Sequence, residues 1–399
     1  MALPHLIVFG IDLVLFAIGF VNFYALYLAI SLSLNLEFGL TGIPNFGKVL
    51  FIAGGAAFAG SISGRLAAYV LGVNTGGDFI GRNAQIILQV DTILASNPIF
   101  ATELLVFGLL IAAGIGALLG YLSSYPAIRL REDYLGMLLL GAAQFFQVFL
   151  RTYEPLIGGA QNIAIPDPFI YWNSVGTSYR DVITGLVVSA FAVMVFLYAE
   201  RVARSPLGRT LRAVRDNEEA SRALGKDDAV IRRNVLMVAS AIAAMAGALF
   251  SFYVASVEYD TWTRFAWTFW PFLIVIIGGA GNNLGVAAGA FFFSIVFKGL
   301  QQIQPQIQPY IFFDVNWLQD LLFGALLISI LLVRPEGIIP EKSTPTLRRR
   351  TLDGLFAKLQ SANQSKAPTG QIAETGVGVL GRIRIMLRKG NKKEPNGPP

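Results

Sequence analysis

The sequence predicts an all-α protein that crosses a lipid bilayer about nine times as a polytopic bundle of transmembrane helices. Of its 399 residues, 54% are hydrophobic and only 14% are charged, a composition too apolar for a water-soluble surface. The apolar residues also gather in runs close to the roughly 17 to 25 residues that a helix needs to span the hydrocarbon core. Short polar segments separate most of these runs, and one long polar segment covers residues 200–234.

Nine apolar runs are the candidate spans. The first run is long enough to tilt or kink, and it is expected to be retained because the N-terminus lacks the Lys/Arg-rich start of a cleavable signal peptide. Only three residues separate the seventh run from the eighth, so the count is good to about one span either way. The runs are residues 6–34, 45–72, 102–128, 134–151, 181–199, 235–257, 267–281, 285–300 and 318–333.

Charge predicts the orientation and the domain organisation. Residues 200–234 hold nine Lys/Arg, and positively charged loops near spans stay in the cytoplasm. Alternation along nine spans then places the N-terminus outside and the C-terminus inside. Residues 1–340 carry 19 Lys/Arg against 21 Asp/Glu, whereas residues 341–399 carry 12 against 4. We therefore expect a transmembrane domain over 1–340 and a disordered basic cytoplasmic tail over 341–399.

The composition argues against most enzyme classes. The chain has no cysteine, and its one histidine is His5. The usual zinc sites and the Ser-His-Asp and Cys-His catalytic sets therefore cannot be assembled within the bundle. We expect no catalytic residues and no metal ligands.

Polar side chains and glycines within the spans are candidates to line a path. Polar groups in lipid usually face a bundle interior or water, and a Gly-rich break can turn half-helix ends toward a ligand. Hydrogen bonds that only fasten helices, or a tight turn at the break, are equal alternatives. The candidates are Asn35, Gln144, Gln147, Gly278, Gly279 and Gly281.

The polar segment 200–234 predicts two short helices on the cytoplasmic face. Pro206 suits a first helical turn, and apolar residues recur after it at helical spacing. A second helix, capped by Asp216 or Asn217, would stop at Gly225 in the left-handed conformation. Such a pair can seat in a groove of a partner, although a solvated, salt-bridged loop is the plainer alternative.

Several short blocks of sequence carry a family resemblance. Glu219-Ala220-Ser221-x-x-x-Gly225 is similar to the EAA-x-x-x-G loop of importer permeases, without the usual Ile-x-Leu-Pro continuation. The other blocks are Asn35-Leu36-x-x-Gly39, Asn45-Phe46-Gly47-Lys48, Leu130-Arg131-x-Asp133-Tyr134, Leu156-Ile157-Gly158-Gly159-x-x-Asn162-Ile163, Ser205-x-Leu207-Gly208-Arg209, Ile277-Gly278-Gly279-x-Gly281 and Arg334-Pro335-x-Gly337. With Lys48 where His is usual and Asn162 where Gly is usual, the chain resembles the branched-chain amino-acid permease family of ATP-binding cassette (ABC) transporters, in particular its LivM-type subunit, over roughly residues 24–340.

The resemblance implies a multi-pass subunit of the cell membrane that works within an importer. Its partners would be a second permease subunit, two ABC ATPase subunits, an extracytoplasmic substrate-binding protein, a small-molecule substrate and membrane lipid, with no nucleic acid. ATP and Mg would bind the ATPases, because this sequence has no Walker A pattern, so the chain itself binds no cofactor. The residues that would couple it to the ATPases are Arg215, Asp216, Glu218, Glu219, Ala220 and Gly225.

The transported solute stays open at this point. Branched-chain or other hydrophobic amino acids are the leading substrate class, and urea, short amides or another small solute are the alternative within the same importer class. An ion-coupled secondary transporter would need paired charges inside the membrane, which are few here, and it would leave the segment 200–234 unexplained. A membrane-embedded enzyme would need a catalytic set that the sequence lacks.

Overall fold

The computed structural model describes residues 7–8, 11–74, 76–130, 132–174, 177–308 and 315–341. They all lie in the first of the two units into which the chain divides, Met1–Lys342. The predicted tail from residue 342 onward, together with His5 and Arg131, lies outside the described residues.

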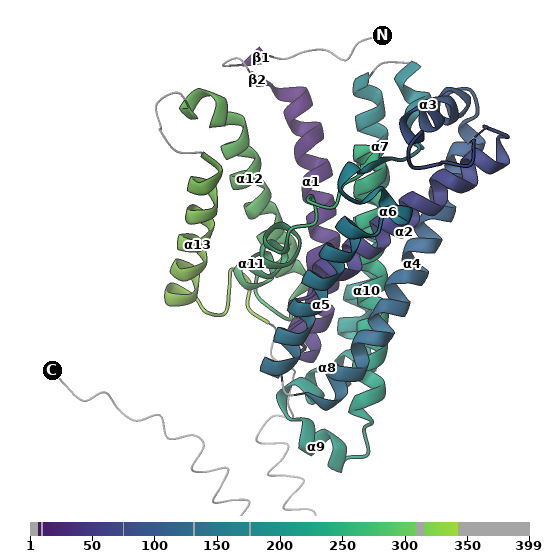
Figure 1. Ribbon diagram of the computed structural model, residues 1–399. Helices are drawn as coiled ribbons and strands as arrows, with labels where there is room; N and C mark the ends of the chain where they lie inside the picture. Colours follow the sequence, from purple (N-terminus) through teal and green to yellow (C-terminus); the bar gives the residue numbers. More distant parts are fainter. Residues whose placement is uncertain are drawn as a thin grey trace, which may run out of the picture. The chain divides into compact units, whose positions relative to one another are not determined.

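Helices dominate the described part of the chain (Figure 1). The α-helices are α1 (Leu13–Leu34), α2 (Lys48–Val70), α3 (Asn83–Leu94), α4 (Pro98–Arg129), α5 (Glu132–Thr152), α6 (Glu154–Ile157), α7 (Thr177–Arg204), α8 (Pro206–Asp216), α9 (Glu218–Ala223), α10 (Asp228–Val254), α11 (Trp270–Gly278), α12 (Asn283–Ile307) and α13 (Val315–Val333). Two π-helical turns, η1 (Asn35–Gly39) and η4 (Phe265–Phe269), adjoin α1 and α11, and two 3-10 turns are η2 (Gly159–Gln161) and η3 (Ile170–Ser174).

The strands are four two-residue segments that form two small antiparallel pairs. β1 (Ile7–Val8) pairs with β2 (Ile11–Asp12), and Val8 lies opposite Ile11. β3 (Ile163–Ala164) pairs with β4 (Ser256–Val257), and Ile163 lies opposite Val257. The second pair ties the loop after α5 to the end of α10.

The prediction of a helical membrane protein is confirmed, with seven candidate spans in place of the nine predicted runs. Among the described residues, seven helices are long and apolar enough to cross a membrane: Leu13–Gly39, Lys48–Val70, Pro98–Ala127, Tyr134–Thr152, Tyr179–Arg204, Asp228–Val254 and Asn283–Gln306. The other two predicted runs form shorter apolar helices, Phe265–Gly278 and Trp317–Val333. The chain before Phe265 is irregular and buries Trp262, so that helix begins inside the packed bundle.

Close backbone contacts hold the centre of the bundle together. A Cβ atom added to Gly116 on α4 would lie 2.6 Å from the carbonyl oxygen of Ser240 on α10. One added to Gly55 on α2 would lie 2.2 Å from the carbonyl oxygen of Ala244. Small residues permit this approach, which is the main source of helix association in lipid.

Aromatic side chains pack a second part of the bundle. Rings from α1, α11, α12 and α13 stack around Phe293, which lies 4.6 Å from Phe323 between ring centroids. Figure 1 shows α12 and α13 side by side, and α8 and α9 together at the end of the bundle opposite the start of α1.

Candidate functional site: the α8–α9 pair and the polar break above it

Local capping builds the two short helices that the sequence predicts. The Ser205 hydroxyl accepts a hydrogen bond from the Gly208 amide and begins α8, with Pro206 in the first turn. Asn217 begins α9, because its side-chain oxygen accepts from the Ala220 amide at 2.9 Å. Gly225 has a φ of +74°, which a residue with a Cβ rarely adopts. The capping alternative is thus decided for Asn217.

Ion pairs fix α9 to the start of α10. Arg222 donates to both carboxylate oxygens of Asp228, at 2.7 and 2.8 Å, and it also pairs with Glu218. Glu218 in turn accepts from Arg232 at 2.8 Å. The bidentate contact with Asp228 raises the pKa of the Arg222 guanidinium. These ion pairs therefore hold α9 and the start of α10 together as one unit.

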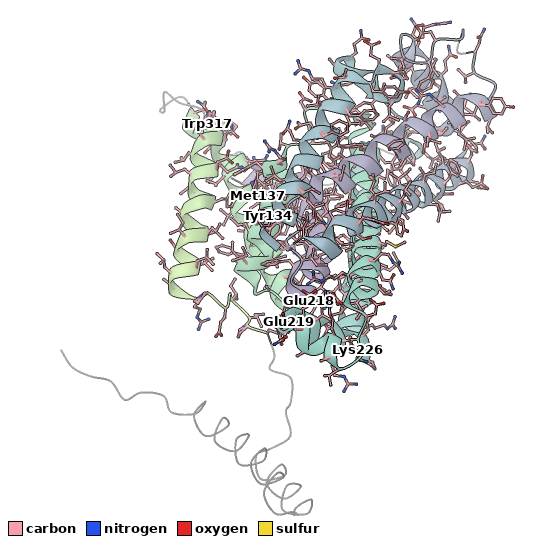
Figure 2. The ribbon with its side chains drawn as sticks, turned by 60° about the horizontal axis from the view of Figure 1, so that its bottom comes forward. Tyr134, Met137, Glu218, Glu219, Lys226 and Trp317 are labelled. Carbon is pink, nitrogen blue, oxygen red and sulfur yellow. The ribbon has the colours of Figure 1, made fainter. Side chains whose placement is uncertain are left out.

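The structure separates the predicted coupling residues into fixed and free side chains. Glu218 is committed to Arg222 and Arg232, whereas Glu219 is exposed and forms no hydrogen bond or ion pair with a described residue. Ala220 and Gly225 are also exposed. Figure 2 shows Glu218, Glu219 and Lys226 close together at the α8–α9 end of the molecule.

Leu224 is a surface residue that sequence reasoning missed. Its side chain is 82% exposed at the end of α9, and the next residues in the chain, Gly225 and Lys226, are exposed as well. An exposed apolar side chain can be buried when a partner protein docks, which adds to the free energy of binding. The signal was a lone leucine just before Gly225, where the apolar face of α8 has already ended.

Arg215 joins α8 to the bundle. Its Nη1 atom donates to the carbonyl oxygen of Gly39 at 2.5 Å, at the end of η1. The same nitrogen lies 2.9 Å from a carboxylate oxygen of Glu341, which also pairs with Arg212 at 3.2 Å. Asp216 pairs with the Arg215 Nε atom at 3.0 Å and is otherwise exposed. One side chain of α8 thus contacts the end of α1 and the segment after α13.

Asn35 joins the start of η1 to the turn between α11 and α12 and, through Asn283, to α7. Its side-chain oxygen accepts from the Gly281 amide and its Nδ2 donates to Asn283, each at 2.9 Å. Asn283 then donates to Glu200, near the end of α7, at 3.0 Å. Asn35 is fully buried, so in this structure it makes the fastening contacts that were the alternative to lining a path.

The Gly-rich break is a tight turn between α11 and α12. Gly279 and Gly281 have φ values of +111° and +83°. A Cβ on Gly278 would lie 2.3 Å from the carbonyl oxygen of Gly285, so the two helix ends touch. Ile338 and Ile339 donate backbone hydrogen bonds to the carbonyls of Ile277 and Gly278. The turn is therefore covered by the segment that leads to Glu341.

A buried ion pair spans the loop between η1 and α2. Glu37 accepts from the Lys48 ammonium at 2.9 Å, and both side chains are 0% exposed. Asn45 also donates to Glu37, at 3.0 Å, and Lys48 reaches the Ala239 carbonyl of α10 at 3.5 Å. This ion pair was not predicted from the sequence. The signal for it was two opposite charges near the edges of adjoining apolar runs.

Gln144 and Gln147 lie elsewhere, on α5. Both are half-buried beside exposed apolar residues such as Met137 and Phe145, and neither forms a hydrogen bond with a described residue. Figure 2 shows Tyr134 and Met137 together on α5. The six candidate path residues therefore fall into two groups, with Asn35 and the glycines at the break and the glutamines on α5.

These features together define a multi-pass membrane protein in which the α8–α9 pair, at the end of the bundle, is tied to a polar break inside it. The chain matches the family "branched-chain amino acid transport system / permease component" over residues 16–331, and it belongs to that family. It is therefore a transport component and not an enzyme.

Three relatives agree with this assignment. A protein described as a probable branched-chain amino acid transport permease LivM, from Methanocaldococcus jannaschii, is 38% identical over 83% of this chain and 95% of its own. The high-affinity LivM permeases of Salmonella typhimurium and Escherichia coli are 28% and 29% identical over 58% and 60% of this chain, and 56% and 57% of their own. No solved structure matches the chain.

Proposed function

We propose that this chain is the permease subunit of an ABC importer for branched-chain or other hydrophobic amino acids. The single observation that carries the proposal is a pair of contacts made by Arg215. These contacts connect the exposed α8–α9 pair to Gly39 and Glu341. Family membership and the relatives named for branched-chain amino acids support the substrate class. The partners would be a second permease subunit, two ATPases and an extracytoplasmic binding protein.

The α8–α9 pair is the proposed docking site for an ATPase subunit. The exposed face offers Glu219, Ala220, Leu224 and Gly225, while Glu218 holds α9 in place. When the ATPases close, α8 would move as a rigid body, and Arg215 would pull on the end of η1 and on Glu341. The tight turn at Gly278–Gly281 lies directly against both contacts.

The outer face of α5 is the proposed border of the transport path. Gln144 and Gln147 carry amides that find no partner among the described residues, and lipid cannot supply one. A water-filled path, or the second permease subunit, would meet them. The exposed Tyr134, Met137 and Phe145 on the same helix suit a permease–permease contact.

The proposed orientation has the N-terminus outside and the α8–α9 end in the cytoplasm. Arginines gather at this end, including Arg201, Arg209 and Arg233, as expected for cytoplasmic loops. The chain has no native cysteine, so a single introduced cysteine reports its own side. Lys226→Cys should react with an impermeant maleimide only from the cytoplasm, and Asn74→Cys only from outside. The reverse pattern would overturn the orientation.

ATP-dependent uptake in proteoliposomes tests the function itself. The chain is reconstituted with its co-encoded permease, ATPases and binding protein, and uptake is measured for leucine, urea and acetamide. Leucine uptake that requires ATP and the binding protein is the expected result. Preference for urea or acetamide would reassign the solute, and uptake by this chain alone under an ion gradient would make it a secondary transporter.

A further inference from the structure

A cavity of about 270 Å³ lies within the bundle, between α1, α7, α10, η4–α11 and α12. Its lining comes from the half of the helices that lies away from α8 and α9 (Figure 1). Seven aromatic side chains form much of its wall: Phe23, Tyr27, Phe250, Tyr253, Trp267, Trp270 and Phe297. Sites for drug-sized ligands span about 300–1,000 Å³, so this chamber suits a smaller molecule with an apolar part.

Two buried polar atoms in the chamber wall lack partners. Asn22 is only 6% exposed, and its Nδ2 atom donates to the carbonyls of Ile18 and Asp181 at 3.2 Å. Its Oδ1 atom is buried without a hydrogen bond, and so is the indole Nε1 atom of Trp270. Unpaired buried groups of this kind are costly. One is an acceptor and the other is a donor, and a bound ligand could satisfy both.

Lys298 places a positive charge at the edge of the same chamber. Its ammonium lies 5.1 Å from the centroid of the Phe23 ring and donates to Gln301 at 3.1 Å. None of the carboxylates in the described residues pairs with it. An ionisable side chain inside a span is by default a functional group that awaits a partner.

The chamber connects with a second cavity toward the end of α12. This cavity, about 540 Å³, shares Gly19, Lys298 and Gln301 with the chamber and adds Leu15, Phe16, Gln302 and Gln304 to its wall. A Cβ on Gly19 would meet nothing within 4 Å, so this position is open space at the junction. A ligand would enter from this second cavity and pass Gly19.

We infer that the aromatic chamber binds the transported hydrophobic amino acid. Its side chain would lie among the rings, its carboxylate would meet Lys298 and the Trp270 indole N–H, and its ammonium would meet Asn22 Oδ1. A purely apolar molecule would leave all three polar groups unmet, and the acyl chains of a phospholipid are too long for the volume. The inference rests on the proposed function.

Paired glycine substitutions test the chamber in the complete importer. Gly19→Phe would fill the junction, whereas Gly114→Phe adds the same ring at an exposed position of α4 that also has nothing within 4 Å. Leucine uptake is expected to fall at least about tenfold with Gly19→Phe and to stay unchanged with Gly114→Phe. Co-purification of all subunits checks the assembly of both variants.

A binding measurement tests the polar contacts separately. Equilibrium binding of radiolabelled leucine to the complex without its binding protein, in phosphatidylcholine nanodiscs, is competed with leucinamide, which lacks the carboxylate. The wild-type complex should prefer leucine about tenfold or more, and Lys298→Met should abolish most of that preference. Trp270→Phe should weaken leucine binding, while the exposed Trp317→Phe should not.

The outcomes separate this inference from the proposed function. If the wild-type importer takes up no hydrophobic amino acid, the proposed function fails. If it takes up leucine and Gly19→Phe matches Gly114→Phe, or if Lys298→Met keeps the full preference for leucine, the chamber assignment is overturned. Leucine binding that is lost only when phosphatidylglycerol is added to the nanodiscs would also overturn it, since lipid would then be the preferred occupant.

Discussion

Arg215 on α8 and Glu341 beyond α13 form an ion pair in which Nη1 and Oε2 lie 2.9 Å apart. Arg215 lies in a helix, whereas Glu341 lies outside the helices and strands. The ion pair covers the turn at Gly281, where an added Cβ would lie 2.8 Å from the Glu341 carboxyl carbon. The sequence segments that carry them lie more than a hundred positions apart, so only folding brings them together.

Removing this pair should impair coupling more than folding. Glu341→Gln deletes a charge shared by Arg212 and Arg215, and such partly exposed pairs are each worth about 0.2–1 kcal/mol. Leucine uptake per ATP hydrolysed, measured in proteoliposomes, is expected to fall about two- to tenfold. Glu336→Gln, in the same segment but exposed and without an ion pair among the described residues, is the matched control. Equal behaviour of the two variants would contradict the role of Glu341.

The free face of α9 makes a prediction about docking. Glu219→Lys should reverse a docking charge, and Gly225→Pro should distort the end of α9, because proline cannot adopt a φ of +74°. Both variants should insert into the membrane normally and lose most ATP-driven uptake. Asp260→Lys, an exposed charge change beyond the far end of α10, is the control. Normal uptake by both variants would show that α9 is not the coupling surface.

The buried pair of Glu37 and Lys48 should dominate local stability. Lys48→Met leaves an uncompensated buried carboxylate, which typically costs about 3–5 kcal/mol, whereas replacing both partners is often nearly neutral. The melting temperature of the purified protein in detergent should therefore drop with Lys48→Met and recover largely in Glu37→Gln/Lys48→Met. Lys226→Met, at an exposed position, should change nothing. A double variant no more stable than the single one would contradict a pairwise role.

Asp91 on α3 should make stability depend on pH. Burial raises its pKa from the ordinary 3.8 to about 7, and the nearby Asp167 charge adds to this, while a hydrogen bond from the Asp167 amide and the charge of Arg180 oppose it. Because the folded pKa is raised, the favourable contribution is complete below about pH 4 and is lost as the pH rises through 7.

The Asp91→Asn variant checks this sign. It should melt like the wild type near pH 4 and at a higher temperature at pH 8, by an amount on the order of 1 kcal/mol in the free energy of unfolding. Differential scanning fluorimetry across this range provides the measurement, with the exposed Asp78→Asn as control. A difference that shrinks toward pH 8 would refute the assignment.

The basic tail makes a separate prediction. Deleting residues 345–399 should leave subunit assembly and uptake unchanged, because their polar, charged composition cannot bury enough apolar surface to form a core. Co-purification and uptake of the truncated chain, with Glu341 kept, provide the check. Loss of assembly would mean that the tail folds on a partner.

Local sequence signals predicted much of the fold and of the α8–α9 pair. Apolar runs of membrane length gave seven helices that meet the criterion for a span and two that are shorter. Pro206, Asn217 and Gly225 predicted the two short helices, because capping and positive φ depend on neighbours within a few residues. The seventh run was harder to judge, because Trp262 and its neighbours enter the bundle as irregular chain.

The sequence by itself determined the solvent, the helical class and the external helical pair, since each depends on composition or on contacts a few residues apart. Only the tertiary structure decided that Glu37 meets Lys48, that Asn35 fastens the turn at Gly281, and that Arg215 reaches Gly39 and Glu341. A polar group in a membrane interior is costly without a partner, and which partner it finds depends on how distant helices pack.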